Sequence, residues 1–147
     1  MSDAPLVCVD TNMLVYARDA RDIEKQERAQ AWMRYLWDEQ CGRVTAQVLH
    51  EYYVCVTQKL KPGLSRAEAR ADVRALAQWL TPQDPMPLIE EAWQRQDESS
   101  LSWWDALVLA GASAASCRYF LTEDLQAGQE FAGIRIVNPF MNEPGRF

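Results

Sequence analysis

Four acidic residues stand where a folded α/β chain would bring their carboxylates together. Asp10 directly follows a short apolar run, and Asp124 follows another, so both are expected just beyond the ends of buried strands. Glu51 and Asp105 lie instead near the starts of two helical segments. Ligands of open parallel sheets bind at the carboxyl edge of the strands. We therefore expect Asp10, Glu51, Asp105 and Asp124 to converge on one site at that edge.

The surroundings of two of these acids indicate that they need a cation. Asp105 is the only acidic or basic residue in the apolar stretch LSWWDALVLAGA. In the stretch TAQVLHEYYVCVTQ, which contains Glu51, the only other acidic or basic residue is His50. A buried carboxylate without a partner costs several kcal/mol or takes up a proton. Mg²⁺ and Mn²⁺ are hard ions that bind carboxylate and water oxygens. A divalent-metal site with these four acids as ligands is therefore the prediction.

A carboxylate metal site of this kind is typical of phosphodiester hydrolysis. The cation polarises the phosphate and makes water a usable nucleophile, and where two ions bind they lie ~3.5 to 4 Å apart. No side-chain nucleophile is required. His50 is the only histidine, and metal-free cleavage through a 2′-hydroxyl needs both an acid and a base. We therefore assign His50 a structural or surface role.

Each acid also has a purely structural interpretation. Asp10 is placed to cap the helix that follows it, and Asp105 to face the dipole of its own helix. Glu51 is placed to accept a buried hydrogen bond, and Asp124 to serve as a turn residue. It is the joint placement of the four, not any one of them, that favours a metal site.

The elements that must position these acids alternate between strands and helices. Apolar runs predict strands at residues 6–9, 43–46, 118–122 and 134–137, and helical spacing predicts helices over 22–40, 47–59, 65–80, 88–96 and 102–115. Three prolines are expected to interrupt the chain before the fourth helix. The alternation predicts a single α/β domain over residues 1–147, with a mainly parallel central sheet flanked by helices on both faces. Residues 141–147 are expected to form a C-terminal tail.

Length and composition agree with one folded domain. The chain has 147 residues, of which 48% are hydrophobic and 24% charged, unlike a disordered protein. No signal peptide or membrane-spanning stretch is readable. The four scattered cysteines contain no CxxC pair, which argues against a zinc site and a secreted disulfide framework. We expect a cytoplasmic protein with reduced thiols and no membrane association.

The charge distribution bears on nucleic-acid binding. A formal net charge of -6 lowers the expectation of binding phosphates, although acids gathered around bound cations can present a locally positive field. Two basic series are candidate phosphate ligands, Arg18, Arg21, Lys25 and Arg28 in the first and Lys59 and Lys61 in the second. Interspersed acids indicate an ordinary solvated helix face instead. Most of the six tryptophans, Trp103 and Trp104 among them, are expected in the core.

Four stretches of the sequence occur together in a distinctive order. They are VDTNMLVYA at residues 9–17, TAQVLHEYYVCVTQKLKPGLS at 45–65, SWWDALVLAGA at 102–112 and YFLTEDLQAGQEFAGIRIVNPF at 119–140, and together they cover most of the chain. In this order they resemble the PIN domains, and within them the toxins of VapBC toxin–antitoxin pairs. By this resemblance the acidic quartet is Asp10, Glu51, Asp105 and Asp124, and the supporting polar positions are Thr11, Asn12 and Thr122.

The resemblance carries expectations about function. It implies a PIN-like fold and an endoribonuclease that depends on Mg²⁺ or Mn²⁺ and hydrolyses RNA phosphodiesters. It further implies the toxin component of a type II toxin–antitoxin system. The expected partners are the RNA substrate, a second copy of the chain in a homodimer, and a small VapB-like antitoxin that lays a segment across the active-site groove.

Two other functions are compatible with parts of the sequence. A non-catalytic PIN-like module would use the same fold to bind RNA or protein, although it has no physical need for unpaired carboxylates. An aspartate-nucleophile phosphatase would use the VDTN motif after the first strand, but such enzymes have a second aspartate where this chain has Asn12. A downstream catalytic lysine for that chemistry is not evident either.

Overall fold

One central sheet of five strands organises the computed structural model, which describes residues 3–147. The strands lie in the order β2-β1-β3-β5-β4. Four of them run parallel, namely β1 (Val7–Val9), β2 (Gly42–Arg43), β3 (Tyr119–Leu121) and β5 (Ile134–Val137). The short β4 (Glu130–Phe131) pairs antiparallel with β5 at the edge. Val9 of β1 lies opposite Leu121 of β3, so the residues that follow these two strands emerge side by side.

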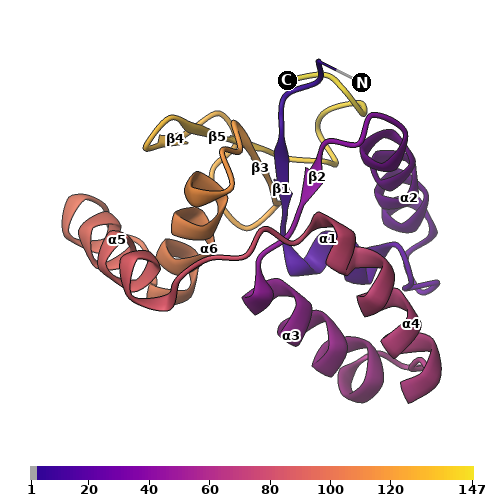
Figure 1. The fold of residues 1–147 in the computed structure, drawn as a ribbon. Coiled ribbons are helices and arrows are strands. Elements are labelled where there is room, and N and C mark those ends of the chain that lie inside the picture. The colour runs from indigo at the N-terminus through magenta and orange to yellow at the C-terminus, as the bar shows by residue number, and fades with distance from the viewer. Residues whose placement is uncertain (1–2) are drawn as a thin grey trace.

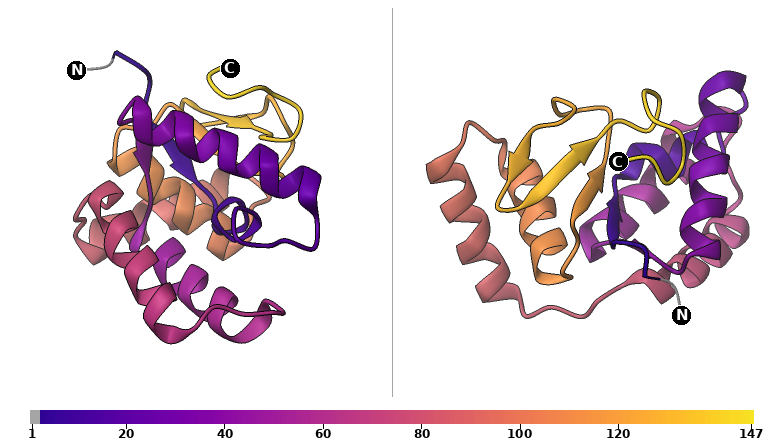
Figure 2. Two further views of the ribbon diagram at one scale, coloured as in Figure 1. Left: turned by 90° about the vertical axis from the view of Figure 1, so that its right-hand side faces the viewer. Right: turned by 90° about the horizontal axis from the view of Figure 1, so that it is seen from above.

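Helices cover both faces of this sheet (Figures 1 and 2). On one side lie α5 (Pro85–Glu98) and α6 (Trp103–Ala114). On the other lie α1 (Thr11–Tyr16), α2 (Ile23–Asp38), α3 (Ala46–Val54) and α4 (Arg66–Leu76). This confirms the predicted α/β architecture with a mainly parallel sheet. Among residues 3–147, no helix combines the length and apolar character needed to span a membrane.

The core forms where the sheet meets the helices. The strands contribute Val7, Val9, Phe120 and Ile136, all essentially inaccessible to solvent. Helix α2 presents Ala29, Trp32 and Leu36 to this core at helical spacing. Near-continuous apolar strands such as VCV are what a parallel sheet buried on both faces requires.

Side-chain caps begin most of the helices, several of them at the predicted residues. Ser65 and Glu68 form the predicted capping box of α4, with both reciprocal hydrogen bonds present. Ser102 accepts a hydrogen bond of 3.1 Å from the backbone N–H of Asp105 at the start of α6. The cap therefore sets the position at which the first turn of α6 presents its acid.

Several elements differ from the sequence prediction. The second strand, predicted at 43–46, spans only Gly42–Arg43, and the helix predicted over 65–80 ends its α geometry at Leu76. Helix α5 begins at Pro85, three residues before the expected start, because proline is tolerated in a first turn whose N–H groups have no helical partner. Strand β4 was not predicted, since a two-residue edge strand leaves no periodic signal. The predicted helix over residues 47–59 ends its regular α geometry at Val54 and continues as a π-helical turn, Cys55–Lys59.

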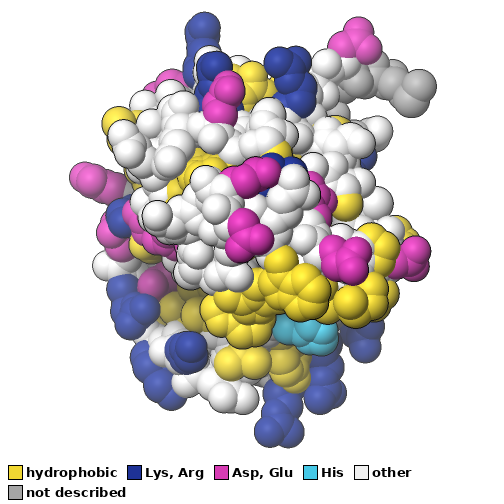
Figure 3. All heavy atoms as spheres, turned by 90° about the vertical axis from the view of Figure 1, so that its left-hand side faces the viewer, with side chains coloured by type: hydrophobic (Ala, Val, Ile, Leu, Met, Phe, Trp, Pro, Cys, Tyr) yellow, Lys and Arg dark blue, Asp and Glu magenta, His cyan; other side chains and the backbone are white. Residues whose placement is uncertain are grey.

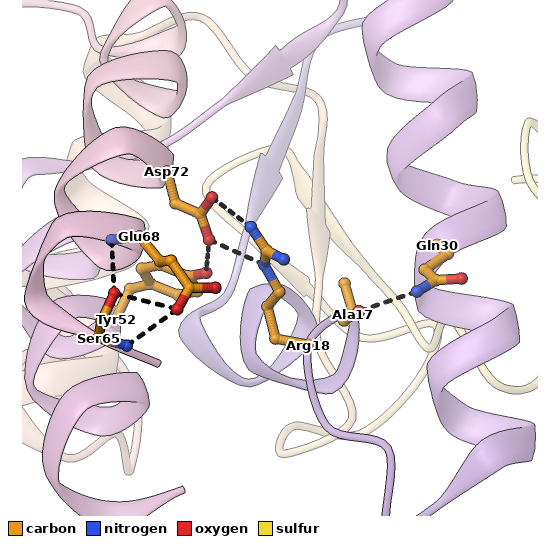
Figure 4. Close-up of polar contacts among 7 residues, drawn as sticks. All are labelled: Ala17, Arg18, Gln30, Tyr52, Ser65, Glu68 and Asp72. Carbon is orange, nitrogen blue, oxygen red and sulfur yellow. Dashed lines mark hydrogen bonds and ion pairs between the residues drawn. The ribbon is translucent and has the colours of Figure 1, made fainter. Parts of the chain in front are cut away.

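A partly exposed polar bridge joins the segments around α3 (Figure 4). Asp72 of α4 accepts two hydrogen bonds from the Arg18 guanidinium, at 2.9 and 2.6 Å, and a third of 2.6 Å from the Tyr52 hydroxyl. Burial and the hydrogen bond to the Asp72 carboxylate raise the pKa of Tyr52 well above its ordinary value. The bridge therefore ties α4 to α3 and to the loop after α1, which holds α3 in place beside the sheet.

The C-terminal residues 141–147 return to pack on the domain. The Trp32 indole N–H donates to the backbone carbonyls of Pro139 and Asn142, at 3.0 and 3.1 Å. The ring of Phe147 stacks on Tyr119 with centroids 4.1 Å apart. The end of the chain thus covers the region between α2 and β3.

Replacing Phe147 with alanine tests this packing. We expect Phe147→Ala to lower the free energy of unfolding by about 1 to 2 kcal/mol, because it removes a stacked aromatic pair and part of the cover over Trp32. Urea denaturation followed by tryptophan fluorescence measures the change. Met141→Ala is the matched control, since Met141 is 72% exposed. Equal stability of the two variants would mean that the C-terminal packing contributes nothing.

Candidate functional site

Asp10 is held at the carboxyl edge of the sheet by its two neighbours. It caps α1, and its carboxylate accepts a hydrogen bond of 2.7 Å from the Thr11 backbone N–H. The other carboxylate oxygen accepts one of 2.7 Å from the Thr122 hydroxyl. Because β1 and β3 are paired in parallel, Thr122 emerges directly beside Asp10. The capping role that the sequence offered as an alternative is therefore present together with the site, not instead of it.

Asp124 is joined to Asp10 through Thr122 and Asn12. The Thr122 hydroxyl oxygen accepts a hydrogen bond of 3.0 Å from the Asp124 backbone N–H, and the Asn12 amide donates to the Asp124 carboxylate at 2.8 Å. Thr122 is 1% exposed, so its hydroxyl is fixed in orientation. Asn12 thus donates a hydrogen bond to a carboxylate. The second aspartate that a phosphatase of the aspartate-nucleophile class has at this position could not donate such a bond while ionised.

The environment of Asp10 resists its ionisation. Burial raises the pKa of Asp10 to about 6, and the nearby charge of Asp124 adds to this, while the Thr122 hydrogen bond acts in the opposite direction. None of the Lys and Arg side chains among residues 3–147 forms a salt bridge with either acid. A bound cation would supply the positive charge that this pair of carboxylates has no protein partner to provide.

The structure brings all four predicted acids to one pocket. The pocket has a volume of about 120 Å³ and is lined by ten residues, namely Asp10, Thr11, Asn12, Gln47, Val48, Glu51, Trp104, Asp105, Val108 and Asp124. Strand ends contribute Asp10 and Asp124, while α3 and the first turn of α6 contribute Glu51 and Asp105. Convergence at the carboxyl edge is thus observed, and the role of the four as metal ligands stays a prediction.

Glu51 is not buried, so the prediction of a buried carboxylate at this position is wrong. Glu51 is exposed and Asp105 half-buried, because the face of α3 that carries Glu51 opens onto the pocket and not onto the core. Within residues 3–147, no three acid, histidine or cysteine side chains lie close enough together to form a complete metal-ligand group. Asp10 and Asp124 lie close to each other. Glu51 and Asp105 line the same pocket but are not close enough to this pair to form a group of three.

The residues present nevertheless fit a hydrated divalent cation. Mg²⁺ keeps several waters and is commonly bound by one or two carboxylates, so mutual contact of four acids is not required. Exposed side chains such as Glu51 change rotamer within picoseconds to nanoseconds. Three buried side-chain polar atoms lack a hydrogen-bond partner among the described residues, and two of them, Thr11 Oγ1 and Gln47 Oε1, belong to residues of this pocket.

Four pocket residues were not predicted from the sequence as part of the site, namely Gln47, Val48, Trp104 and Val108. Gln47 lies one helical turn before Glu51, a spacing that places both on one face of α3. Trp104 was expected in the core, but it is 63% exposed at the pocket. Trp103 is half-buried and packs toward α5 with the small alanines of that interface. Adjacent helix residues point about 100° apart, and here that rotation places Trp103 against α5 and Trp104 at the pocket.

The first basic series is engaged by acids, most of which come from other parts of the chain and not from the interspersed acids of the sequence prediction. Four ion pairs are formed, Arg18 with Asp72, Arg21 with Asp19, Lys25 with Glu123 and Arg28 with Glu143. Lys25 also lies over the rings of Tyr16 and Phe140, 4.8 Å from each centroid. His50 is exposed, in agreement with a surface role. The second series, Lys59 and Lys61, forms no ion pair in the described chain.

Solved structures of similar shape come from bacterial toxin–antitoxin systems. A chain of a toxin–antitoxin complex from Klebsiella pneumoniae matches with a TM-score of 0.64 at 17% identity, covering 90% of this chain and 97% of the other. A chain of DNA-bound VapBC from Salmonella typhimurium gives 0.62 at 15% identity, covering 90% and 96%. VapC20 of Mycobacterium tuberculosis, a toxin that cleaves the sarcin–ricin loop, gives 0.54 at 22%, covering 78% and 86%. The chain has a VapC-like fold.

This agreement lies in shape and not in sequence. No family model and no curated protein matches the chain. The likeness in fold extends over nearly the full length of the Klebsiella and Salmonella chains. Within that fold, the four acids occupy the carboxyl edge of the sheet, where α/β proteins bind ligands.

Proposed function

We propose that this protein is a metal-dependent endoribonuclease that hydrolyses RNA phosphodiesters with Mg²⁺ or Mn²⁺. The observation that carries the proposal is the convergence of Asp10, Glu51, Asp105 and Asp124 on one pocket of a VapC-like fold. The pocket offers carboxylate oxygens and no thiol or imidazole, which is the ligand chemistry of hard divalent ions. One of the structures with the same fold is a toxin described as cleaving the sarcin–ricin loop.

The residues of the pocket divide into two proposed roles. Asp10 and Asp124 would hold the cation most directly, and Glu51 and Asp105 would complete its surroundings. When bound, the cation would polarise the phosphodiester and make a water molecule more acidic. Thr122 and Asn12 orient the two carboxylates through the hydrogen bonds described above, and Thr11 orients Asp10 through its backbone N–H.

We further propose that the protein is the toxin of a type II toxin–antitoxin pair. Two of the similar structures are VapBC complexes bound to DNA, which supports a VapB-like antitoxin as the partner. The proposed assembly is a homodimer. Exposed apolar side chains are available for such contacts, the most exposed of the large ones being Ile23, Met86, Trp93, Trp104 and Met141. The four free cysteines agree with a cytoplasmic protein whose thiols stay reduced.

One observation favours the non-catalytic alternative. The acids of the described chain do not form a group of three at metal-binding distances, as a PIN-like binding module without catalysis would also allow. A binding module, however, would not need two neighbouring carboxylates that share the Thr122 hydroxyl. It would also not need an Asp10 whose pKa is raised to about 6. The two functions are separated by whether RNA is cut.

Metal removal is the direct test of the proposed activity. Purified, antitoxin-free protein is incubated with total RNA in Mg²⁺ or Mn²⁺, and we expect cleavage that EDTA abolishes and that excess Mn²⁺ restores. Asp105→Asn is expected to lose at least about tenfold in rate, as loss of a metal-supporting group does. The matched control is Asp97→Asn, an exposed acid on α5 outside the pocket.

Three outcomes separate the proposals. Cleavage that persists in EDTA and in Asp105→Asn would contradict a metal-dependent site. Intact RNA with a folded protein, together with retained RNA binding, would favour the non-catalytic module. Equal losses in Asp105→Asn and Asp97→Asn would show that the pocket has no special role.

A further inference from the structure

The exposed ring of Trp104 at the carboxylate pocket has no structural explanation in the domain. Its side chain is 63% exposed although it lines the pocket. Its backbone carbonyl accepts a hydrogen bond of 3.4 Å from the Gln47 amide, which links the first turn of α6 to α3. A large indole neither serves core packing at this exposure nor binds a hard cation. The ring is therefore available to a ligand that reaches the acids.

A second hollow continues the pocket in the direction of the π-helical turn. It has a volume of about 360 Å³ and shares Thr11, Asn12 and Glu51 with the carboxylate pocket. Its remaining walls are His50, Val54, Cys55 and Lys59. The shared residues make the two hollows one continuous surface, with Trp104 lining one part and Lys59 the other. π-Helical turns occur frequently at functional sites, and this one ends in Lys59.

Lys59 is the basic residue that lines this second part, beside the shared Glu51, and it lies in a segment more basic than the rest of the chain. Residues 46–80 contain five Lys or Arg and three acids, a net charge of +2, while the rest of the chain contains ten and eighteen, a net charge of -8. None of these five, Lys59, Lys61, Arg66, Arg70 and Arg74, forms a salt bridge within the described residues 3–147. In Figure 3, Lys and Arg side chains and the single histidine border a hydrophobic band, with acidic side chains on its other side.

We propose that single-stranded RNA lies along this continuous surface, with one base stacked on Trp104 and a backbone phosphate bound by Lys59. Aromatic rings bind unpaired bases through their π-faces, and lysines bind phosphates through charge. The segment between these contacts passes the four acids, so the two residues position the phosphodiester at the pocket. This inference rests on the proposed function for the cleavage step, but the binding itself requires no cleavage.

Replacing Trp104 tests the stacking contact. Binding of a fluorescein-labelled, random-sequence single-stranded RNA is measured by anisotropy in EDTA, where no cutting is expected. Trp104→Ala should weaken binding about 5- to 100-fold, the range for loss of one base–aromatic stack. Trp104→Phe should restore most of the affinity. Trp93→Ala is the matched control, because Trp93 is 51% exposed on α5 away from the pocket.

An RNA with abasic sites tells stacking from other roles of the ring. If Trp104 stacks on a base, the wild-type protein loses affinity on a fully abasic RNA, and Trp104→Ala then causes no further loss. Equal binding of wild type, Trp104→Ala and Trp93→Ala to the ordinary RNA would overturn this contact. So would a Trp104→Ala defect of the same size on abasic RNA.

The salt dependence of binding tests the phosphate contact of Lys59. Removing one lysine that neutralises a phosphate of a single strand lowers the slope of log K against log salt by about 0.7. We expect Lys59→Gln to show this smaller slope and about two- to fivefold weaker binding. Arg118→Gln is the control, since Arg118 is exposed just before β3, at the opposite edge of the sheet. An unchanged slope in Lys59→Gln would overturn the contact.

These measurements keep the inference separate from the proposed nuclease. Loss of binding in Trp104→Ala and Lys59→Gln supports the RNA path whether or not the protein cuts RNA. Cleavage without any change in binding by these variants would support the nuclease and overturn the path. Weaker binding of an acidic protein partner by Lys59→Gln, with RNA binding unchanged, would assign this surface to a protein and contradict the proposal.

Discussion

Asp10→Asn is expected to reduce RNA cleavage by at least about 100-fold while leaving the protein folded. Loss of a group that only supports a metal ligand costs ~10- to 100-fold, and Asp10 is proposed as a ligand itself. Asparagine retains an oxygen that accepts the Thr122 hydroxyl but lacks the charge that holds a cation. Initial rates on total RNA, and Mn²⁺ affinity by calorimetry, measure the two effects.

The same variant is expected to be more stable than the wild type without metal. The pKa of Asp10 is raised from 3.8 to about 6 in the folded protein, so folding takes up a proton at pH values between these two, where the unfolded carboxyl is ionised and the folded one is protonated. The contribution of protonated Asp10 to the free energy of unfolding is fully present below pH 3.8, the pKa in the unfolded chain. It is lost as the pH rises through about 6, the pKa in the folded protein. The shift corresponds to at most ~3 kcal/mol. We expect Asp10→Asn to gain about 1 to 2 kcal/mol at neutral pH in EDTA and little at acid pH.

Two controls make this prediction decisive. Asp3→Asn changes an exposed acid outside the pocket and should alter neither rate nor stability. Adding Mn²⁺ should stabilise the wild type and not Asp10→Asn, because only a folded state that binds the ion gains from it. An Asp10→Asn protein that cuts RNA at the normal rate, or that is destabilised at neutral pH in EDTA, would contradict the proposed site.

Thr122→Val is expected to lower cleavage about 10- to 100-fold, the effect of removing a hydrogen bond that orients a metal ligand. Valine has the shape of threonine and fits the buried position, but it cannot donate to Asp10 or accept from the Asp124 N–H. The Thr122 hydrogen bond lowers the pKa of Asp10, so its removal should move the acid side of the pH–rate profile to higher pH. Steady-state rates across the pH range measure both changes.

Thr122→Ser tells a positioning role from a merely structural one. Serine keeps the hydroxyl and loses only a methyl group, so we expect it to restore the pH profile and most of the rate. Thr122→Val is also expected to lose about 1 to 2 kcal/mol of stability, since a partly buried N–H is left without its acceptor. A rate loss in Thr122→Val without any shift in the pH profile would indicate that Thr122 acts only through packing.

Local sequence signals determined much of this architecture. The apolar run before Asp10 is a buried parallel strand, the Ser65 and Ser102 caps begin their helices, and the strands alternate with helices as predicted. These features depend on neighbouring residues only, through side-chain periodicity and the hydrogen bonds of a first helical turn. The convergence of four acids followed from one further rule, that ligands gather at the carboxyl edge of parallel strands.

The tertiary structure alone decided which way each side chain faces. Glu51 is exposed to the pocket and not buried. Trp104 points outward, while its neighbour Trp103 packs inward. The C-terminal Phe147 packs on Trp32. The register of β1 with β3 likewise decided that Thr122 reaches Asp10 across 112 positions of sequence. Orientation depends on contacts between segments far apart in the chain, and periodicity within one segment carries no information about them. The sequence by itself therefore determined the elements and the acids, while long-range packing decided the shape of the pocket and the ring that borders it.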